Sequence, residues 1–506
     1  MVITTGPAGL LELRDRAHDR VQRALVRPGR LPRLRPPLPT LDERRYGLDG
    51  QRAYMGSLDG TWIQAPRQTS VVVIAAQGAR KTRAVVIPNV AQWDGCVVST
   101  TTKGDVLRHS FAARTRRGKV WVFDPLSIIP ELPEGAHRLQ WSPLRGCKNA
   151  EVARLQAQRL CQDAGKGSTD RTHWKTRGTQ LLSALLHAAG LAGYPMSTVV
   201  EWVDKTSLDQ AQQILLHHKS VRAWGVLEGI KNTPERERGS FWSAVTGILA
   251  PFHSDVVLNS ADAAGGCAFE PIEFLAGGNT VYIVAPSDAQ IDAAPLIVGL
   301  VEEIRTAARY VSDQLGGELP IPLLLALDEV CNLCPLESLP TIIWEARARN
   351  IVVIAVLQAV GQAIARYGRD IVDALLYNGG VGTLFLHGCG EHDVMTRLEE
   401  LGGPMWVPQT TSTASRSATG PLAGFRWLDV THSASTNHGW VKVPRYPGNV
   451  VREIAEGQAW IVLRNCPLGL IEVRDFTTLS PFREWAAMSP VLDVVTATAR
   501  SAGQRN

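Results

Sequence analysis

From Ser70 onward, short runs of apolar and often β-branched residues alternate with longer amphipathic stretches. Short runs that are apolar throughout are typical of strands buried on both faces, and the stretches between them are long enough for crossover helices. The pattern therefore predicts an α/β fold with a mainly parallel sheet. The predicted strands are 71–76, 96–101, 120–124, 280–286, 323–329, 351–358 and 381–388.

The strand pattern is interrupted over residues 148–270, where apolar residues recur at i, i+3 and i+4. Stretches such as GTQLLSALLHAAGLAG and TSLDQAQQILLHH carry this helical spacing, so we expect an all-α domain inserted into the α/β domain. The predicted organisation is an Arg/Pro-rich N-terminal segment (1–45), an α/β domain (46–147 and 271–475), the all-α insertion (148–270) and a C-terminal tail (476–506).

Three segments near the end have patterns of their own. PQTTSTASRSATG, at 408–420, is rich in Ser and Thr and predicts a loop or a mobile segment. GQAWIVLRN and GLIEVRDF, which follow it, predict a closing hairpin. The last dozen residues, VTATARSAGQRN, predict a frayed end.

Composition narrows the class of protein. A chain of 506 residues with 45% hydrophobic residues can bury more than one core. The net charge of +5 suits a polyanionic partner without requiring one. Eight scattered cysteines favour a reducing cytoplasm, and the C-x-x-C at Cys331 and Cys334 lacks the second pair of ligands that a zinc site needs. No apolar run approaches the ~18 residues that span a bilayer, so we expect no transmembrane segment.

The N-terminal segment is expected to form a short helix from Leu10 to Val26, followed by the proline-punctuated RPGRLPRLRPPLP. Its arginines cannot all be neutralised within the segment. Two interpretations stay open: an arm for lipid headgroups or DNA phosphates, or a solvated linker.

AAQGARKT, residues 75–82, follows the predicted strand 71–76 and opens a helix that we expect to run to Gln92. It nearly matches G-x-x-x-x-G-K-[ST], a loop whose N–H groups, lysine and hydroxyl hold phosphates and magnesium. Ala75 and Arg80 replace both glycines, so this stretch alone leaves nucleotide binding open. The arginine side chain must point away from a nucleotide or contact it as an extra cation. The candidate nucleotide-binding residues are Gly78, Ala79, Arg80, Lys81 and Thr82.

Adjacent acids, Asp328 and Glu329, end the apolar run PLLLALDEV. P-loop ATPases place the aspartate that holds magnesium and the glutamate that polarises water at this point. The alternative is that these acids only cap the next helix, which would account for one of the two acids. The next predicted strand ends in Gln358, placed to sense a γ-phosphate, although a polar strand terminus is also ordinary.

The order of these pieces resembles the conjugative coupling proteins of type IV secretion systems, the TraG/TraD-like DNA-translocating ATPases. The resemblance covers roughly residues 46 to 475. It includes VVIPNVAQWDGCVV after the phosphate loop, GKVWVFDP, WSPL at the start of the helical insertion, and the long stretch LALDEVCNLCPLESLPTIIWEARARNIVVIAVLQAVGQAIARYG. Thr101 and Ser142 depart from that family's D-P-K-G-E and W-N-P-L, and its usual N-terminal membrane helices are missing here.

The resemblance implies a RecA-like P-loop NTPase domain with ATP and Mg²⁺ as cofactors. Lys81 would bind phosphate, Thr82 and Asp328 would hold magnesium, Glu329 would be the catalytic base and Gln358 the sensor. In EARARN, the resemblance matches Arg347 to an arginine finger that reaches the nucleotide of a neighbouring subunit, with Arg349 as second choice. An ion pair on a helix surface is the alternative for Arg347.

It also implies a homo-hexamer that binds DNA without sequence preference, with a relaxase or relaxosome and type IV secretion channel proteins as partners. Cargo recognition falls to the all-α insertion. We expect a cytoplasmic protein recruited to the inner face of the membrane. Two functions stay open: an ATP-hydrolysing coupling protein that delivers or pumps DNA with bound protein, or a non-hydrolysing docking protein. Arg80 favours the second function, and the intact Lys81, Thr82, Asp328, Glu329 and Gln358 favour the first.

Overall fold

The computed structural model describes residues 47–161, 171–262, 269–286, 290–378, 380–419 and 429–490. The N-terminal segment 1–45 with its expected helix, and the frayed last dozen residues, lie outside these ranges.

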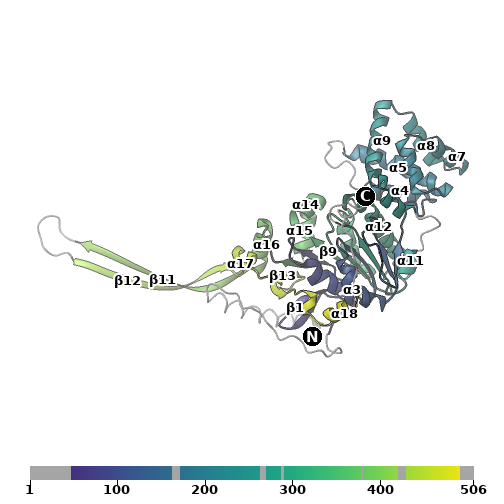
Figure 1. Cartoon of the computed structure of the whole chain (residues 1–506). Coiled ribbons are helices and arrows are strands. Elements are labelled where there is room, and N and C mark those ends of the chain that lie inside the picture. Colours follow the sequence, from purple (N-terminus) through teal and green to yellow (C-terminus); the bar gives the residue numbers. More distant parts are fainter. Residues whose placement is uncertain are drawn as a thin grey trace, which may run out of the picture.

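A single large sheet organises the α/β part of the chain (Figure 1). In the described residues it has twelve strands in the order β2-β1-β14-β13-β10-β3-β9-β8-β4-β7-β5-β6. All seven strands predicted from the apolar runs are present, and every neighbouring pair from β10 to β6 is parallel. They are β3 (Val71–Ile74), β4 (Cys96–Thr101), β5 (Val120–Phe123), β7 (Thr280–Val284), β8 (Leu323–Leu327), β9 (Ile351–Leu357) and β10 (Gly382–Leu386).

One edge of the sheet turns antiparallel. β13 (Gln458–Leu463) and β14 (Gly469–Glu472) form the predicted closing hairpin, and β13 pairs with β10. Sequence reasoning missed the strands at both edges, because each is only four or five residues long and has too little alternation to stand out. These are β1 (Tyr54–Leu58), β2 (Thr61–Gln64) and β6 (Ala136–Leu139).

Alternating residues of the strands supply two separate cores. Val71 and Val73 face a core shared with the π-helical turn η2 (Thr82–Val86), α2 (Ile87–Gln92) and α3 (Asp105–Thr115). Val72 and Ile74 face the other core. Helices on that side are α12 (Gln290–Gln314), α13 (Leu339–Ala346), α14 (Val360–Tyr367), α15 (Arg369–Tyr377) and α16 (His392–Gly402). Both faces are covered, as continuously apolar parallel strands require.

The region 148–270 forms a helical body at one end of the molecule (Figure 1). Its long α5 packs against α4, α7, α8 and α9, and α4 packs against α12 of the α/β part. Each helix has an apolar stripe that faces α5 or its neighbours, which is why the sequence shows the 3.6-residue period here. The helices are α4 (Ala150–Leu160), α5 (Arg171–Ala192), α6 (Met196–Asp204), α7 (Asp209–His217), α8 (Val221–Lys231), α9 (Glu235–Leu249) and α10 (Asp255–Ala261).

The prediction of a loop or mobile segment at 408–420 is wrong for residues 408–419. β11 (Pro404–Thr419) pairs in continuous antiparallel register with β12 (Asp429–Pro444), and the hairpin projects far from the sheet (Figure 1). The two extended strands satisfy each other's backbone groups without a core, so no buried face leaves an alternating pattern in the sequence. Trp406 and Trp440, near its base, are 61% and 67% exposed.

The segment that we expected to be a C-terminal tail begins as packed structure. After η5 (Phe476–Thr478), helix α18 (Phe482–Ala487) lies against α3 and α2. Phe482 is 1% exposed and its ring centroid lies 5.5 Å from that of Tyr54. Residues 476–487 therefore belong to the core under the antiparallel edge.

Within the described ranges, no single helix has both the length and the apolar composition to cross a membrane. One pair, Glu235–His253 and Asp255–Ala261, meets these criteria only jointly and is bent by 93° at its break.

The hairpin should be dispensable for folding, because its exposed strands contribute little buried area. Replacing residues 408–440 by Asn-Gly, which joins the directly paired Val407 and Val441, should leave the free energy of unfolding within about 0.5 kcal/mol of the parent chain. Urea unfolding followed by circular dichroism measures this. A loss of several kcal/mol would show that the hairpin packs on the core.

Candidate functional site

The carboxyl ends of four neighbouring parallel strands meet at one edge of the sheet. In register, Ile74 of β3 lies opposite Leu357 of β9 and Phe385 of β10, and Leu327 of β8 lies opposite Ala355. The residues that follow these strands must therefore gather at this edge. They are the loop 75–82, Gln358, the acidic pair Asp328 and Glu329, and His387.

The loop after β3 folds like a phosphate loop despite its missing glycines. Ala75 replaces the first glycine without strain, since its φ is not positive and its N–H donates to the carbonyl of Leu357 at 3.0 Å. Gly78 has a φ of +85°, and no atom stands within 4 Å of where its Cβ would be. Arg80 occupies the left-handed region with a φ of +55°, as the replaced glycine would. The substitution thus keeps the backbone path and adds strain.

The helix expected from Lys81 to Gln92 forms, but its first full turn is π-helical. The segment Thr82–Val86 is a π-helix that continues into α2. Such turns occur mostly as single turns inside α-helices, frequently at functional sites. Here the turn begins at Thr82, directly after Lys81.

Lys81 and Thr82 meet the acidic pair. The Nζ atom of Lys81 lies 3.8 Å from Oε1 of Glu329, and Oγ1 of Thr82 donates to Oδ2 of Asp328 at 2.5 Å. Asp328 is 3% exposed, and this burial raises the pKa of its carboxyl, opposed by the hydrogen bond from Thr82 and the charge of Lys81. The structure therefore brings four of the sequence-predicted residues into one cluster.

This cluster fits a magnesium–phosphate group. A carboxylate and a hydroxyl in direct contact are hard oxygen donors of the kind Mg²⁺ prefers, and magnesium sites use one or two such groups plus phosphate oxygens. Lys81 is 8% exposed, so its ammonium is a little-hydrated charge beside the loop N–H groups. The carboxylate of Asp328 is buried, with the hydroxyl of Thr82 as its contact and the charge of Lys81 nearby, so it gains stability from a bound cation.

Gln358 and Arg347 lie at opposite ends of the same strand. Gln358 follows β9 directly, between the phosphate loop on β3 and the acidic pair on β8. Arg347 precedes β9, in η4 (Arg347–Arg349), so the seven residues of β9 place it roughly 20 Å from the phosphate loop of its own chain. Its exposed side chain has no ion pair with a described residue. Arg349 instead pairs with Asp313 at 2.5 Å.

Sequence reasoning missed a cavity beside the phosphate loop. Its volume is about 620 Å³, and Ala79 and Arg80 form the part of its wall that belongs to the loop. Arg80 points toward it and pairs with Glu456, Nη2 to Oε1 at 2.9 Å, which settles where this side chain goes. Arg83 holds Asp475 through two hydrogen bonds, at 2.5 and 3.1 Å. The other lining residues are His387, Gly457, Val473, Arg474, Thr477, Thr478 and Arg483.

Among the cavity residues that sequence reasoning missed, only His387 has a feature in the sequence that could have pointed to it. His387 is a polar residue near the end of the predicted strand 381–388, and a polar strand end is the feature that singled out Gln358. Glu456 and Asp475 come from the antiparallel edge, where nothing in the sequence ties them to the phosphate loop. Their place depends on β13 and β14 pairing beside β10.

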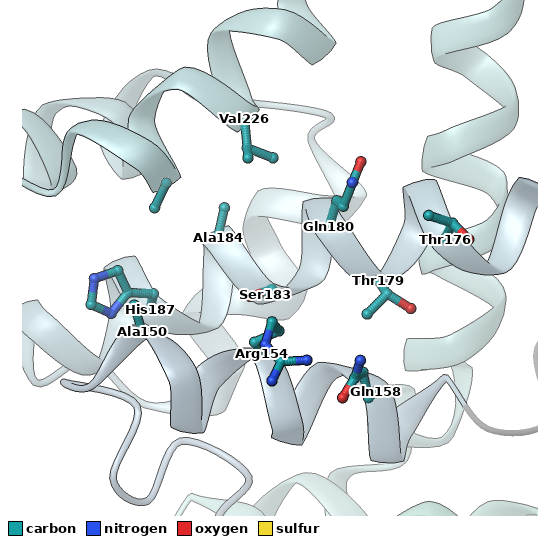
Figure 2. A pocket seen from close by; sticks show the side chains of 11 residues that line it. Ala150, Arg154, Gln158, Thr176, Thr179, Gln180, Ser183, Ala184, His187 and Val226 are labelled. Carbon is teal, nitrogen blue, oxygen red and sulfur yellow. The ribbon is translucent and has the colours of Figure 1, made fainter.

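A second cavity, of about 450 Å³, lies among α4, α5 and α8 of the helical region (Figure 2). His187 on its wall has both ring nitrogens engaged, Nδ1 with the carbonyl of Cys147 at 2.8 Å and Nε2 with Oγ of Ser220 at 3.0 Å. This histidine is therefore structural, since it ties α5 to the start of α4 and of α8.

In the C-x-x-C pair, Cys334 is fully buried in the apolar core.

The parallel sheet, the phosphate loop after β3 and the acidic pair after β8, with β9 between them, define a P-loop NTPase fold of the RecA-like type. The predicted fold class is confirmed. The model of the family "Type IV secretory system Conjugative DNA transfer" matches residues 39–420, and the chain belongs to this family. The resemblance seen in the sequence is thereby confirmed.

Solved structures of the bacterial conjugative coupling protein TrwB share the fold. Its unbound form, lacking the first 70 residues, is 17% identical, with a TM-score of 0.58, and the match covers 83% of this chain and 88% of that one. TrwB in complex with the GTP analogue GDPNP is 16% identical, with a TM-score of 0.59 and coverage of 85% and 91%. TrwB with ADP and Mg²⁺ is 16% identical, with a TM-score of 0.58 and coverage of 84% and 89%. No curated protein sequence matches the chain.

The left-handed backbone at Arg80 should be measurable as strain. Arg80→Gly and Arg80→Ala both remove the ion pair with Glu456 and differ only by a Cβ, so the glycine variant should be more stable by about 1 kcal/mol. Urea denaturation of the full chain measures the difference. Ala79→Gly is the matched control, because φ at residue 79 is not positive and glycine there should destabilise by about 0.5–1 kcal/mol. Equal stability of the two Arg80 variants would contradict the assignment.

Proposed function

We propose that this chain is a coupling ATPase of a conjugative type IV secretion system, which uses ATP hydrolysis to deliver DNA and bound protein to a membrane channel. One observation carries the proposal: Lys81, Thr82, Asp328 and Glu329 converge at the carboxyl edge of a RecA-like sheet in a chain of the conjugative DNA transfer family. TrwB, which has the same fold, is recorded in complex with ADP and Mg²⁺.

The proposed roles follow from position. Lys81 and the N–H groups of the loop hold the β- and γ-phosphates, and Thr82 and Asp328 hold magnesium. Magnesium, when bound, neutralises charge on the phosphates. Glu329, beside Lys81 at the sheet edge, orients a water and accepts its proton, and Gln358 contacts the γ-phosphate from the strand between them.

The rival function is a docking protein that binds DNA without turnover, and Arg80 is the feature that favours it. The geometry weakens this rival in one respect. Arg80 keeps the backbone conformation of a glycine and directs its side chain to Glu456, so the phosphate-binding N–H groups stay available. We therefore favour the ATPase.

Partners and location rest on family membership. We propose assembly into a ring of six, contact with a relaxosome and with channel proteins, and action at the cytoplasmic face of the membrane. Fractionation of cells with and without the secretion channel checks the location, and a chain that remains outside the membrane fraction in both would contradict recruitment.

The full chain should hydrolyse ATP faster when DNA is present. Lys81→Ala should lower kcat by roughly 10²-fold or more, because it removes a charge aimed at the phosphates. Glu329→Gln should retain ATP binding and lose turnover, since the amide cannot accept the proton. Phosphate release with and without DNA measures both. Turnover of the unmodified chain no higher than that of Lys81→Ala, with DNA binding intact, would establish the docking function instead.

Arg347 should act on the nucleotide of a neighbouring subunit, because its own phosphate loop lies at the other end of β9. The Arg347→Ala and Lys81→Ala chains should each be inactive alone. When they are mixed in equal amounts and assemble at random, roughly a quarter of the nucleotide sites should regain activity. Each active site needs an intact loop from one subunit and an intact arginine from the next. The matched control is Arg349→Ala, because this neighbouring arginine is already engaged by Asp313 and Ser312 within its own chain. Absence of recovery on mixing would exclude a finger in trans.

A further inference from the structure

The cavity beside the phosphate loop adjoins the proposed phosphate site. Ala79 and Arg80 belong both to the loop and to the cavity wall. The cavity lies on the β10 side of β3, whereas Asp328, Glu329 and Gln358 lie on the β9 side. A nucleotide whose phosphates rest on the loop therefore has its catalytic groups on one side and this cavity on the other.

The size of the cavity suits a small organic group. Its volume of about 620 Å³ falls within the ~300–1,000 Å³ of small-molecule sites. Its lining combines polar side chains with the small and apolar surface of Gly457 and Val473. A nucleoside combines a flat apolar ring with polar edges and fits this lining.

The charges that line the cavity argue against the binding of a polyanion there. Each arginine on its wall already has a carboxylate partner: Arg80 pairs with Glu456, Arg474 with Glu472 at 2.7 Å and Arg483 with Glu484 at 2.7 Å. Asp475 on the same wall is held by Arg83. With its cations paired, the cavity offers hydrogen bonds more than net positive charge, which suits an uncharged base and ribose.

His387 supplies a free hydrogen-bonding group at this wall. It follows β10 directly, and its Nδ1 is buried without a hydrogen-bond partner in the described structure. A buried polar atom left unpaired costs roughly 1–3 kcal/mol, so a partner is expected in the functional state. Rotation of the imidazole about its Cβ–Cγ bond exchanges Nδ1 with Cδ2 without moving the backbone, so the ring can present this nitrogen to a ligand.

We propose that this cavity binds the nucleoside part of the triphosphate and that His387 donates to, or accepts from, its base or ribose. The inference rests on the proposed nucleotide site and goes beyond it, since it assigns a specificity-determining residue on the side of the loop away from the acidic pair. Gln358 and His387 then flank β3 with separate tasks. Gln358 serves the phosphate end, and His387 serves the nucleoside end.

Binding of ATP and of inorganic triphosphate, each with Mg²⁺, separates the two ends of the site. Titration calorimetry of the full chain should show that His387→Ala weakens ATP binding roughly three- to tenfold and leaves inorganic triphosphate unchanged, because the latter has no nucleoside. His387→Gln, which retains a hydrogen-bonding group, should recover part of the loss. His392→Ala is the matched control, an exposed histidine at the start of α16 that should change neither affinity.

A second variant tests the cavity without touching the histidine. Thr478 is exposed and lies on the cavity wall, so Thr478→Trp should fill the space and weaken ATP but not inorganic triphosphate. Equal effects of His387→Ala on both ligands, or no effect on either, would overturn the assignment while leaving the phosphate site intact. If the unmodified chain binds neither ligand, the proposed function fails, and this inference fails with it.

Discussion

The hydrogen bond from Thr82 to Asp328 joins two loops separated by 246 residues, and the site depends on it. It forms only because β3 and β8 run parallel with β9 between them, so that their carboxyl ends reach the same edge. Burial raises the pKa of Asp328, and the hydroxyl of Thr82 and the ammonium of Lys81 oppose that shift. A buried carboxylate of this kind gains stability when a cation arrives, which couples binding to the geometry of the sheet edge.

The missing glycines change how the phosphate loop is built but leave its path in place. At Ala75 the backbone never needed a positive φ. At Arg80 it does, and the long side chain extends away from the loop to Glu456 on the antiparallel edge. The degenerate motif is therefore tied to a second structural feature, the hairpin of β13 and β14 that brings Glu456 and Asp475 beside the loop.

The helical region and the β11–β12 hairpin, the two largest additions to the sheet, lie away from the phosphate loop and the acidic pair. The helical region joins the α/β part through α4 and α12, and the β11–β12 hairpin leaves from the end of α16. Among their described residues, neither addition has a side-chain contact with the phosphate loop or the acidic pair. The core can thus hold its geometry independently of the additions, and its fold is shared with TrwB at 16–17% identity.

The sequence by itself determined the parallel strands, the helical interruption and the residues at the strand ends, because continuous apolar runs and 3.6-residue spacing are local signals of burial. Only the tertiary structure decided the length of the β11–β12 hairpin, the packing of residues 476–487, and the meeting of Arg80 with Glu456 and of Arg83 with Asp475. An exposed strand pair buries no face and leaves no period, and a contact between distant segments depends on strand order. Neither feature can therefore be predicted from a local stretch of the sequence.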